Sequence, residues 1–547
     1  MPTRLDSHRN SHVEPMMTQS PGSVLDVIIV GSGINSLVCA ALLARSGRKV
    51  LMLERETQLG GCIRTDELTL PGFHHDTLST AHPLFMVGPA YAALGKALHE
   101  AGLEYCNTSE PTAVLLPDGR HLTLSTSHEQ NLAAFDAAHA GDGQAYAQAL
   151  HRVQANAPLV FGLLGNELWR WNTLGTVAQA IWQHGPRHAM GFLGEALTPA
   201  SAWLRQEVKS DLVAALLAPW VLHCGLSPDA PLSSLMAQVV AMTLEGVGLP
   251  LVKGGNANTV RAFERLIREA GGLIETDADV ARVLVQRGRS VGVALADGRT
   301  YRAANVVCNV TPTQLYGRLL DKSDVPQTVV AEAQAWRYGK GNMQIHLALD
   351  EAPRWNAEAL REVGYVHLTA GVDAVSRAVN EAERGLLPAA PTICVAQPTV
   401  LDPTRAPPGK HILWVQLPEC PRHPVGDALG ALEIELAGEW TPALREAYAD
   451  RIIDTLAQSI PNLRPSILGR AVLSPADLAA LNINLVGGDP YGGDCALDQS
   501  FFWRPSRIHR NHSTSVRGLW HIGASTHPGP GLGGTSGFHV ASALGAK

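Results

Sequence analysis

The chain has 547 residues, of which 46% are hydrophobic and 17% are charged, and its formal net charge at pH 7 is −7. This composition indicates a large soluble globular protein with a substantial core, and the length predicts more than one domain. Basic residues are scattered along the chain and form no stripe, which argues against a nucleic-acid-binding protein.

The cysteines and the N-terminus exclude further classes. The eight cysteines lie far apart, without a C-x-x-C pair or an ordered His/Cys spacing, so neither a disulfide framework nor a metal site is indicated. Residues 1–23 lack the apolar core of a secretory signal, and we expect a disordered start and a cytoplasmic protein. The apolar run from 24 to 44 is broken at its centre by Gly31-Ser32-Gly33, so no membrane span is predicted.

The segment "DVIIVGSGINSLVCAALLARSGRKVLMLE" (26–54) predicts a buried strand, a glycine turn, a helix and a second strand that ends in an acid. This order is that of a βαβ dinucleotide-binding unit. Gly31 permits the tight turn, and Gly33 leaves room for a pyrophosphate at the helix N-terminus. Ser36 replaces the third glycine of the motif, and Glu54 is expected to bind the 2′-hydroxyl of an adenosine ribose.

The residues after Glu54 favour FAD over NAD. Gly60 and Gly61 follow within a few residues, and the pattern "E…GG…RT" is typical of FAD proteins. The segment resembles the FAD-binding fold of the glutathione-reductase type, and this resemblance implies that Arg64 lies near the phosphates or the flavin. Further cofactor contacts are expected from Ile34, Asn35 and Arg55.

The segment 93–251 is rich in alanine and leucine and has helical periodicity, which predicts a helical substrate or lid domain. It holds a concentration of tryptophans, at positions 169, 171, 182, 203 and 220. These residues indicate a helical core, the lining of an apolar ligand site or a membrane-facing lip. The apolar stretch 211–251 allows two interpretations in the same way, a helical core or a peripheral membrane contact.

Residues 252–316 return to an α/β pattern. Glycine pairs at 254–255 and 271–272 bound a predicted helix, and three strands follow. We interpret this as a second FAD-binding segment, with Val280 on the adenine side and Asn309 at a strand end near the nucleotide. Residues 317–470 predict the sheet and helices of the substrate domain, with strands at 343–350, 392–397 and 410–418 and a helix at 430–460.

The last segment, 471–547, predicts a strand at 519–522, a Gly/Pro loop and a helix that starts near Gly534. The N-terminus of such a helix offers N–H donors to an anionic centre, and reduced flavin is negative at N1. We therefore expect an α/β protein with a discontinuous, Rossmann-like FAD-binding domain made of 24–92, 252–316 and 471–547. The cofactor contacts expected here are Gly523, Ala524, Gly533, Gly534 and Thr535.

Together the three segments resemble the phytoene desaturase and carotenoid isomerase family of FAD-dependent, amine-oxidase-like flavoproteins, in particular its pyridine nucleotide-disulfide oxidoreductase domain branch. The resemblance rests on "GSGINSLVCAALLARSG", "VKGGNANTV", "LDPTRAPPGKH", "LDQSFFWRP" and "GLWHIGASTHPGPGLGG". It implies non-covalent FAD and hydride removal from an apolar terpenoid or carotenoid-like substrate. A monoterpene such as limonene, hydroxylated with oxygen from water, is also compatible with it.

Other activities stay open. No second G-x-G-x-x-G unit is present, so we expect the electrons to leave to a quinone or another acceptor rather than to a nicotinamide. Alternatives are a redox-neutral isomerase, an amine oxidase, or a flavin-binding subunit paired with a paralogous chain. Peripheral membrane contact and a homo-oligomer are further open alternatives.

Histidines are the candidate acids and bases. His527, beside the predicted flavin helix, and His82 are the first candidates, with Arg504 and His521 behind them. Each also has a purely structural interpretation, as a hydrogen-bonded residue of a loop. The stretch "GGDC" at 492–495 superficially resembles a site of covalent flavin attachment, but a buried thiol is the favoured interpretation.

Overall fold

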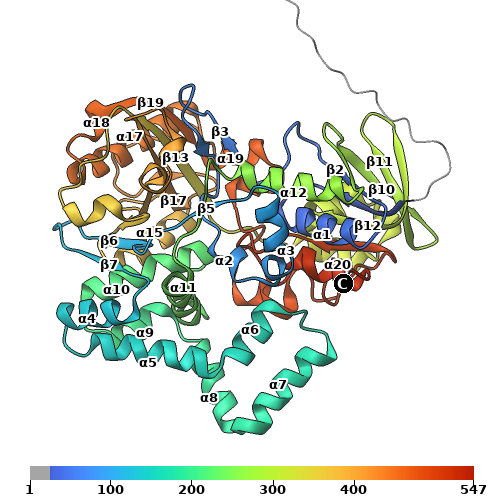
Figure 1. Ribbon diagram of the computed structural model, residues 1–547, viewed down its shortest axis with the longest axis horizontal. Helices are drawn as coiled ribbons and strands as arrows, with labels where there is room; N and C mark the ends of the chain where they lie inside the picture. The colour runs from blue at the N-terminus through green and yellow to red at the C-terminus, as the bar shows by residue number, and fades with distance from the viewer. Residues whose placement is uncertain (1–24, 547) are drawn as a thin grey trace, which may run out of the picture.

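The computed structural model describes residues 25–546, so the expected disordered start lies outside the described residues. Figure 1 shows two lobes side by side, each built on a sheet, with helices of the segment 128–247 below them. Each sheet has seven strands. The α/β class with a discontinuous cofactor domain is confirmed.

The first sheet has the order β10-β11-β12-β1-β2-β9, and β20 pairs with β12 on the other side. Strand β1 lies between β12 and β2, parallel to both. Its side chains are almost all buried, which explains the uninterrupted apolar run. The strands are β1 (Leu25–Val30), β2 (Val50–Leu53), β9 (Leu273–Glu275), β10 (Val280–Gln286), β11 (Arg289–Leu295), β12 (Thr300–Asn309) and β20 (Leu519–Ile522).

Helices from three distant segments pack together with one face of this sheet. Their buried side chains form a single apolar cluster with those of β1 and β2. The last of these helices begins at Thr535, with Gly534 as its N-cap, as the sequence predicts. The helices are α1 (Ile34–Arg45), α3 (Pro89–Glu100), α12 (Ala257–Glu269) and α20 (Thr535–Ala543).

The second sheet has the order β19-β13-β17-β16-β14-β6-β7. One face is aliphatic and packs against α17 (Pro442–Ser459), which starts at a capping Thr441 and is shorter than the predicted helix. The strands are β6 (Thr112–Leu115), β7 (His121–Leu124), β13 (Gly341–Leu349), β14 (Tyr365–Leu368), β16 (Ile393–Ala396), β17 (His411–Cys420) and β19 (Ile467–Leu473).

Strands β6 and β7 come from the segment expected to be helical, so that expectation needs a correction. The two strands form an antiparallel hairpin around the turn "PDGR". This is a recognisable hairpin signal, but the alanine and leucine content of the surrounding segment concealed it.

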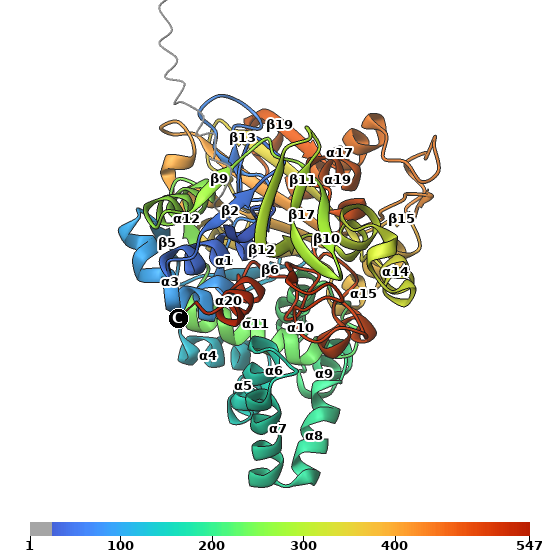
Figure 2. The ribbon, with the colours of Figure 1, turned by 90° about the vertical axis from the view of Figure 1, so that its right-hand side faces the viewer.

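The helical segment divides into a buried part and a projecting part. Helix α10 (Asp211–Leu217), η1 (Ala218–Cys224) and α11 (Ser233–Val247) contribute mostly buried side chains to the core, which confirms the core interpretation of 211–251. Helices α7 (Trp171–His184) and α8 (Pro186–Ala196) form a hairpin that projects from the body (Figures 1 and 2). The remaining helices here are α4 (His128–Ala138), α5 (Asp142–Ala155), α6 (Ala157–Gly165) and α9 (Ala200–Glu207).

The tryptophans divide in the same way. Trp203 and Trp220 are buried, whereas Trp171 and Trp182 on the projecting hairpin are 88% and 85% exposed. Within residues 25–546, no helix combines the length and the apolar character that crossing a bilayer requires.

A buried cluster of one arginine and two aspartates joins the lobes. Arg405, fully buried, donates to Asp76 at 2.8 Å and to Asp402 at 3.2 Å. Asp76 also accepts from the backbone N–H of Asn256 at 2.9 Å, and Asp402 from that of Gly254 at 2.6 Å. Segments 74–76, 252–256 and 402–405 are thereby held at one point.

We expect Arg405→Met to lower the free energy of unfolding by about 3–5 kcal/mol, because it leaves two carboxylates buried without their counter-charge. Chemical denaturation followed by circular dichroism measures this. The control is Arg354→Met, since Arg354 bonds Glu351 on the surface with 63% of its side chain exposed, and exposed pairs contribute about 0–1 kcal/mol. Equal losses in the two variants would contradict the role given to Arg405.

Candidate functional site

A cavity of about 800 Å³ runs between the two lobes. Its walls come from the first sheet and α1, from the C-terminal loop, from α11 and η1, and from the second sheet. Charged side chains line it at one end only, near the carboxyl ends of β1 and β2. The other end is lined by aromatic, aliphatic and uncharged polar side chains.

The charged end is built around the start of α1. Gly31 has a φ of +87°, a backbone conformation that glycine adopts readily, and it turns the chain from β1 towards the helix. Gly33 is the N-cap and provides no side-chain hydrogen bond. The first N–H groups of α1, beginning at Ile34 and Asn35, are therefore available to an anion, which the helix dipole also favours.

Glu54 lies at the end of β2 and is held in a fixed orientation. It accepts from the N–H of Ser32 at 2.9 Å, from the Ser32 hydroxyl at 2.6 Å and from the N–H of Glu56 at 3.0 Å. A carboxylate has about four acceptor positions, so one remains for a ribose hydroxyl. The Ser32 hydroxyl also accepts from the N–H of Gly60, at 2.9 Å, which fixes the glycine pair above the turn.

The starts of α1 and α20 are joined directly. Asn35 accepts from the hydroxyl of Ser536 at 2.8 Å and from the N–H of Gly537 at 3.3 Å. A Cβ at Gly537 would lie 1.9 Å from the carbonyl oxygen of Asn35, so only glycine allows this approach. Two helix N-termini therefore face the same cavity.

These features fit FAD. The uncapped start of α1 suits a pyrophosphate, Glu54 suits a ribose, and the second helix start, at Gly534 and Thr535, suits the negative charge of a reduced flavin. All predicted cofactor contacts except Ser36 and Gly523 line the cavity. Those two lie behind it, where Ser36 accepts from the side chain of Asn309 at 3.0 Å and Gly523 leaves space for that side chain.

Arg55 and Arg64 differ in their surroundings. Arg64 lines the cavity, but its guanidinium is held by two hydrogen bonds to Asp66, at 2.8 and 3.1 Å. Arg55 is exposed and pairs with Glu56 at 3.2 Å. Both arginines line the cavity, and their contacts with the cofactor stay predictions.

The catalytic histidines predicted from the sequence lie beside the cavity but do not line it. Nε2 of His527 donates to the carbonyl oxygen of Asn166 at 3.1 Å, and burial lowers the His527 pKa to about 3. His82 is buried at the start of a short helix, α2 (Pro83–Met86), and burial lowers its pKa to about 4. Both imidazoles are neutral at pH 7, and their catalytic roles stay predictions.

The two reserve candidates have structural partners. Arg504 is buried and donates to the carbonyl oxygens of Tyr491 and Ala524, at 2.7 and 2.9 Å, which ties the loop before β20 to the loop after it. His521 donates to the carbonyl oxygen of Val310 at 2.7 Å. Neither side chain lines the cavity.

Sequence reasoning missed the residues at the uncharged end. Trp220 and His223 of η1 lie there opposite Tyr365 and Trp414 of the second sheet. Ring centroids of Trp220 and His223 are 4.8 Å apart, and those of Tyr365 and Trp414 are 5.6 Å apart. No sequence spacing links these positions, because strand pairing through β16 brings Tyr365 and Trp414 together and η1 packs against them.

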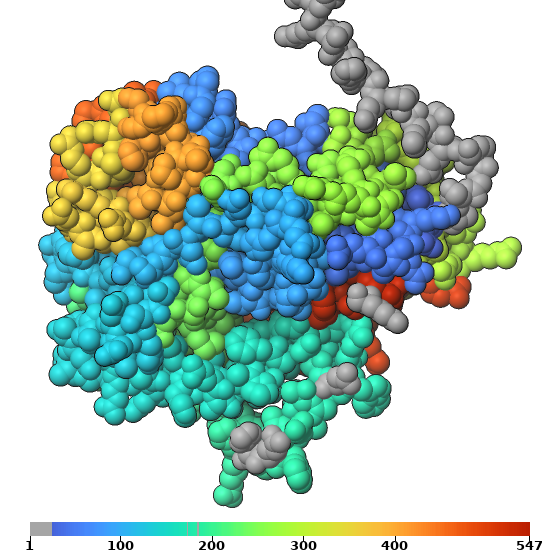
Figure 3. Space-filling view, viewed as in Figure 1, coloured from blue at the N-terminus to red at the C-terminus, as the bar shows by residue number. Residues whose placement is uncertain are grey.

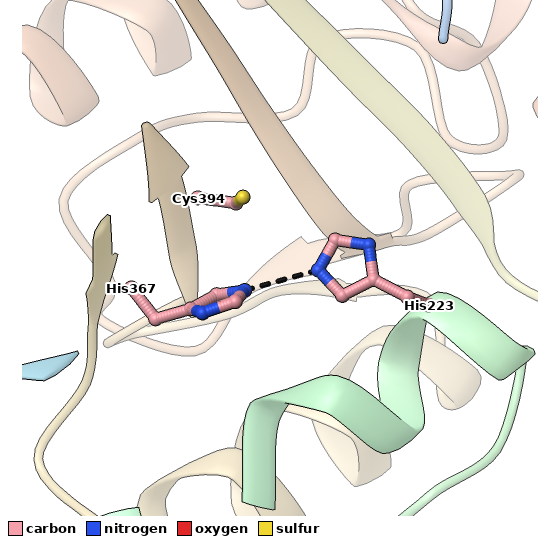
Figure 4. A group of neighbouring side chains, drawn as sticks. All are labelled: His223, His367 and Cys394. Atoms are coloured by element: carbon pink, nitrogen blue, oxygen red, sulfur yellow. Dashed lines mark hydrogen bonds between the residues drawn. The ribbon is translucent and has the colours of Figure 1, made fainter. Parts of the chain in front are cut away.

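His223 belongs to a compact group with His367 and Cys394 (Figure 4). The Nε2 atoms of the two histidines are 3.0 Å apart and share a hydrogen bond, and the potential ligand atoms of all three residues lie within 4.8 Å of one another. His367 and Cys394 are paired residues on β14 and β16. Burial raises the pKa of the Cys394 thiol well above its usual range. The expectation that the protein binds no metal stays a prediction.

Comparison with known proteins assigns the family. Residues 37–466 match the family model described as flavin containing amine oxidoreductase. The chain belongs to this family. It is therefore an FAD-dependent oxidoreductase. Cys495 is buried and does not line the cavity, in agreement with non-covalent FAD.

Curated relatives cover nearly the whole chain. "Pyridine nucleotide-disulfide oxidoreductase domain-containing protein 2" of Mus musculus is 29% identical over 94% of this chain and 92% of its own length. One of the limonene dehydrogenase subunits of Castellaniella defragrans is 24% identical over 95% of this chain and 94% of its own. "Phytoene desaturase (lycopene-forming)" of a Paracoccus species is 30% identical over 57% of each chain.

Solved structures share the fold. Cyclohexylamine oxidase from Brevibacterium oxydans matches with a TM-score of 0.56 and 15% identity, over 95% of this chain and 99% of that one. An oxidoreductase from Methanosarcina mazei matches with a TM-score of 0.55 and 17% identity, over 95% and 100%. At such identities the likeness establishes the architecture alone.

We expect Gly537→Ala to reduce bound FAD, because the added Cβ separates the starts of α1 and α20. The ratio of flavin to protein absorbance after purification measures the occupancy. The control is Gly194→Ala on α8, where an added Cβ meets nothing within 4 Å. Full flavin occupancy in the Gly537→Ala protein would show that the contact between these helices does not shape the cofactor site.

Proposed function

We propose that the protein is a dehydrogenase or desaturase that removes hydride from an apolar, terpenoid or carotenoid-like substrate and passes the electrons to a quinone or another acceptor. The observation that carries this proposal is the continuity of the cavity from the cofactor end to an uncharged end. Relatives named as limonene dehydrogenase and phytoene desaturase support the substrate class.

The residues of this chain bind and orient both molecules. When bound, FAD supplies the hydride acceptor. The start of α1 and Glu54 hold the nucleotide, and the start of α20 favours negative charge at the flavin end. Trp220, Tyr365 and Trp414 provide apolar walls that exclude water and position a C–H bond. His527 and His82 remain the proposed acid and base.

An anaerobic titration of the FAD-loaded protein tests the proposal. We expect the 450 nm absorbance of the flavin to fall with monoterpenes or with phytoene and to persist with simple amines. Product analysis then separates desaturation from hydroxylation with oxygen from water. Bleaching by amines alone would make the protein an amine oxidase, and a flavin that no donor reduces would favour the isomerase or the partner-subunit alternative.

A variant tests the proposed acid or base directly. We expect His527→Ala to lower the rate of flavin reduction while FAD stays bound, and full turnover in this variant would remove His527 from the mechanism.

We also propose that the protein is cytoplasmic and that its projecting hairpin contacts a membrane surface. Eight large apolar side chains of 161–193 are exposed, and six of them belong to α7 and α8, the hairpin at the lower edge of the view in Figure 3. Single exposed apolar residues are common on protein surfaces, but this concentration within one segment indicates an interaction surface, and its tryptophans favour the membrane interface. These residues are Phe161, Trp169, Trp171, Leu174, Ile181, Trp182, Met190 and Leu193.

The opening of the cavity supports this second proposal. Three residues line the cavity and are also exposed at the surface: Phe161 on α6, Leu84 on α2 and Val87. Helices α6 and α7 pack against each other, so the hairpin rises next to the opening. An apolar substrate dissolved in the bilayer would reach the cavity without crossing water.

We expect the variant Trp171→Ala/Trp182→Ala to lose most of its sedimentation with phosphatidylcholine vesicles. The control is Leu429→Ala/Leu436→Ala, which removes two apolar side chains that are 57% and 53% exposed, from the lobe of the second sheet. Equal sedimentation of wild type, variant and control would exclude the hairpin as the attachment. If the wild type stays in the supernatant and elutes as a dimer or with a second chain, the patch binds protein instead.

A further inference from the structure

The cavity-facing side of the second sheet carries a row of uncharged polar residues. Gln344 on β13 pairs with Gln416 on β17, Gln416 pairs with Cys394 on β16, and Cys394 pairs with His367 on β14. Paired residues of neighbouring strands point to the same face of a sheet. Asn342 lies at an irregularity of β13, two residues before Gln344, and also lines the cavity.

The opposite face of the same strands has a different composition. Its apolar side chains are fully buried against α17. They include Met343 and Ile345 on β13, Val415 on β17, Val395 on β16 and Val366 on β14. A sheet that only floors a hydrocarbon cavity would present aliphatic side chains on both faces. The polar row therefore lies on the face of the sheet that lines the cavity, and the packing of the sheet does not require it.

The amides of this row have no hydrogen-bond partner in the described part of the chain. Among residues 25–546, no hydrogen bond is formed by the side chains of Asn342, Gln344 or Gln416, and all three line the cavity. Asn342 and Gln344 are each only 2% exposed. A buried polar group without a partner destabilises a fold by about 1–3 kcal/mol, so such groups in a cavity indicate a bound molecule.

Gln397 is a buried glutamine whose side-chain hydrogen bonds stabilise the fold, and it provides a comparison for Gln344. It is also 2% exposed, and its amide accepts from the indole of Trp355 and donates to the carbonyl oxygens of Leu360 and Val363, each at 2.9 Å. The contrast with Gln344 is one of hydrogen bonding and not of burial.

His223 adds a donor to this end of the cavity. Only one proton lies between its Nε2 and that of His367, and Nδ1 of His367 is buried without a partner. A buried N–H without an acceptor is rarer than a buried lone pair without a donor, so we assign the shared proton to His367. The proton of His223 then lies on Nδ1, which has no partner among the described residues.

The partner of these groups must be uncharged. The charged side chains that line the cavity are Glu54, Arg55, Glu56, Arg64, Asp279 and Arg318, which lie with the cofactor-binding segments. Burial lowers the pKa of His223 to about 4 and that of His367 well below its usual range, so both are neutral at pH 7. A carboxylate or an ammonium group would be buried here without a counter-charge, which is strongly unfavourable.

We propose that Asn342, Gln344, Gln416 and His223 form a binding site for an uncharged hydroxyl or carbonyl group on an otherwise apolar substrate. The apolar body of this molecule lies against Trp220, Tyr365 and Trp414. The proposal rests on the proposed function in one respect, that the molecule in this cavity is the substrate of the flavin.

Binding of one carbon skeleton with four different groups tests the proposal. The probes are p-cymene, cuminyl alcohol, cuminate and cuminylamine, measured by equilibrium dialysis against the FAD-loaded protein at pH 7. We expect cuminyl alcohol to bind at least about tenfold more tightly than each of the other three. Equal or tighter binding of p-cymene, cuminate or cuminylamine would overturn the proposal.

Two variants assign the preference to the row. In Gln344→Leu/Gln416→Leu the preference for the alcohol over p-cymene should disappear. In Thr243→Val it should persist, because the hydroxyl of this cavity residue already donates to Val239 at 2.8 Å. A preference that survives in the Leu variant would overturn the assignment to these glutamines.

Stability measurements keep the proposal falsifiable if ligands bind weakly. We expect Gln344→Leu to leave the melting temperature of the ligand-free holoenzyme unchanged or to raise it, and Gln397→Leu to lower it, since only the second loses hydrogen bonds. A lowered melting temperature in Gln344→Leu would mean that its amide serves the fold. Equilibrium dialysis measures binding without turnover. If the protein binds cuminyl alcohol more tightly than the other probes but no donor reduces its flavin, the proposed dehydrogenase activity is wrong and the proposed binding site stands.

Discussion

Arg405 is a buried charge that holds together three segments far apart in the chain. Its guanidinium lies inside the protein with two aspartates, and each aspartate also binds a backbone N–H at the start of the second cofactor segment. Such an arrangement tolerates one geometry only, because any shift leaves an ion without its partner in a medium of low dielectric constant. The relative placement of the two sheets, and hence the width of the cavity between them, depends on it.

The cavity has a charged end and an uncharged end because a different sheet lines each end. The first sheet ends its parallel strands at helix starts and glycine turns, which suit the negative charges of a nucleotide. The second sheet presents amides and aromatic rings, and η1 adds the ring of Trp220 and the imidazole of His223, all uncharged. A flavin held at the junction would have fixed dipoles on one side and an apolar chamber with a few polar groups on the other.

The nucleotide end could be predicted from the sequence because its signals are local. The glycine turn after β1, the acid at the end of β2 and the strand, loop and helix at the C-terminus each lie within a short stretch, and the structure places them as expected. The hairpin of β6 and β7 was missed, although its turn "PDGR" was readable.

The uncharged end of the cavity could not be predicted, because its polar row forms only when strands far apart in the chain pair. This row consists of Gln344, Gln416, Cys394 and His367. His527 shows a second limit. Its neighbour Pro528 lines the cavity while its own ring turns to Asn166, and sequence proximity to a site does not give the direction of a side chain.

The order in which the chain is made has a consequence for the first sheet. Strand β1 is among the first described residues, yet β20, the strand that completes the sheet beyond β12, begins at Leu519. At about 5–20 residues per second, synthesis of the stretch between them takes roughly 25–100 s. During this interval the emerging β1 and α1 carry an apolar surface whose covering helix, α20, has not yet been translated. The cofactor site therefore forms only after β20 and α20 have been translated, and a nascent chain that stops before Leu519 exposes apolar side chains of α1 that the folded cofactor domain buries.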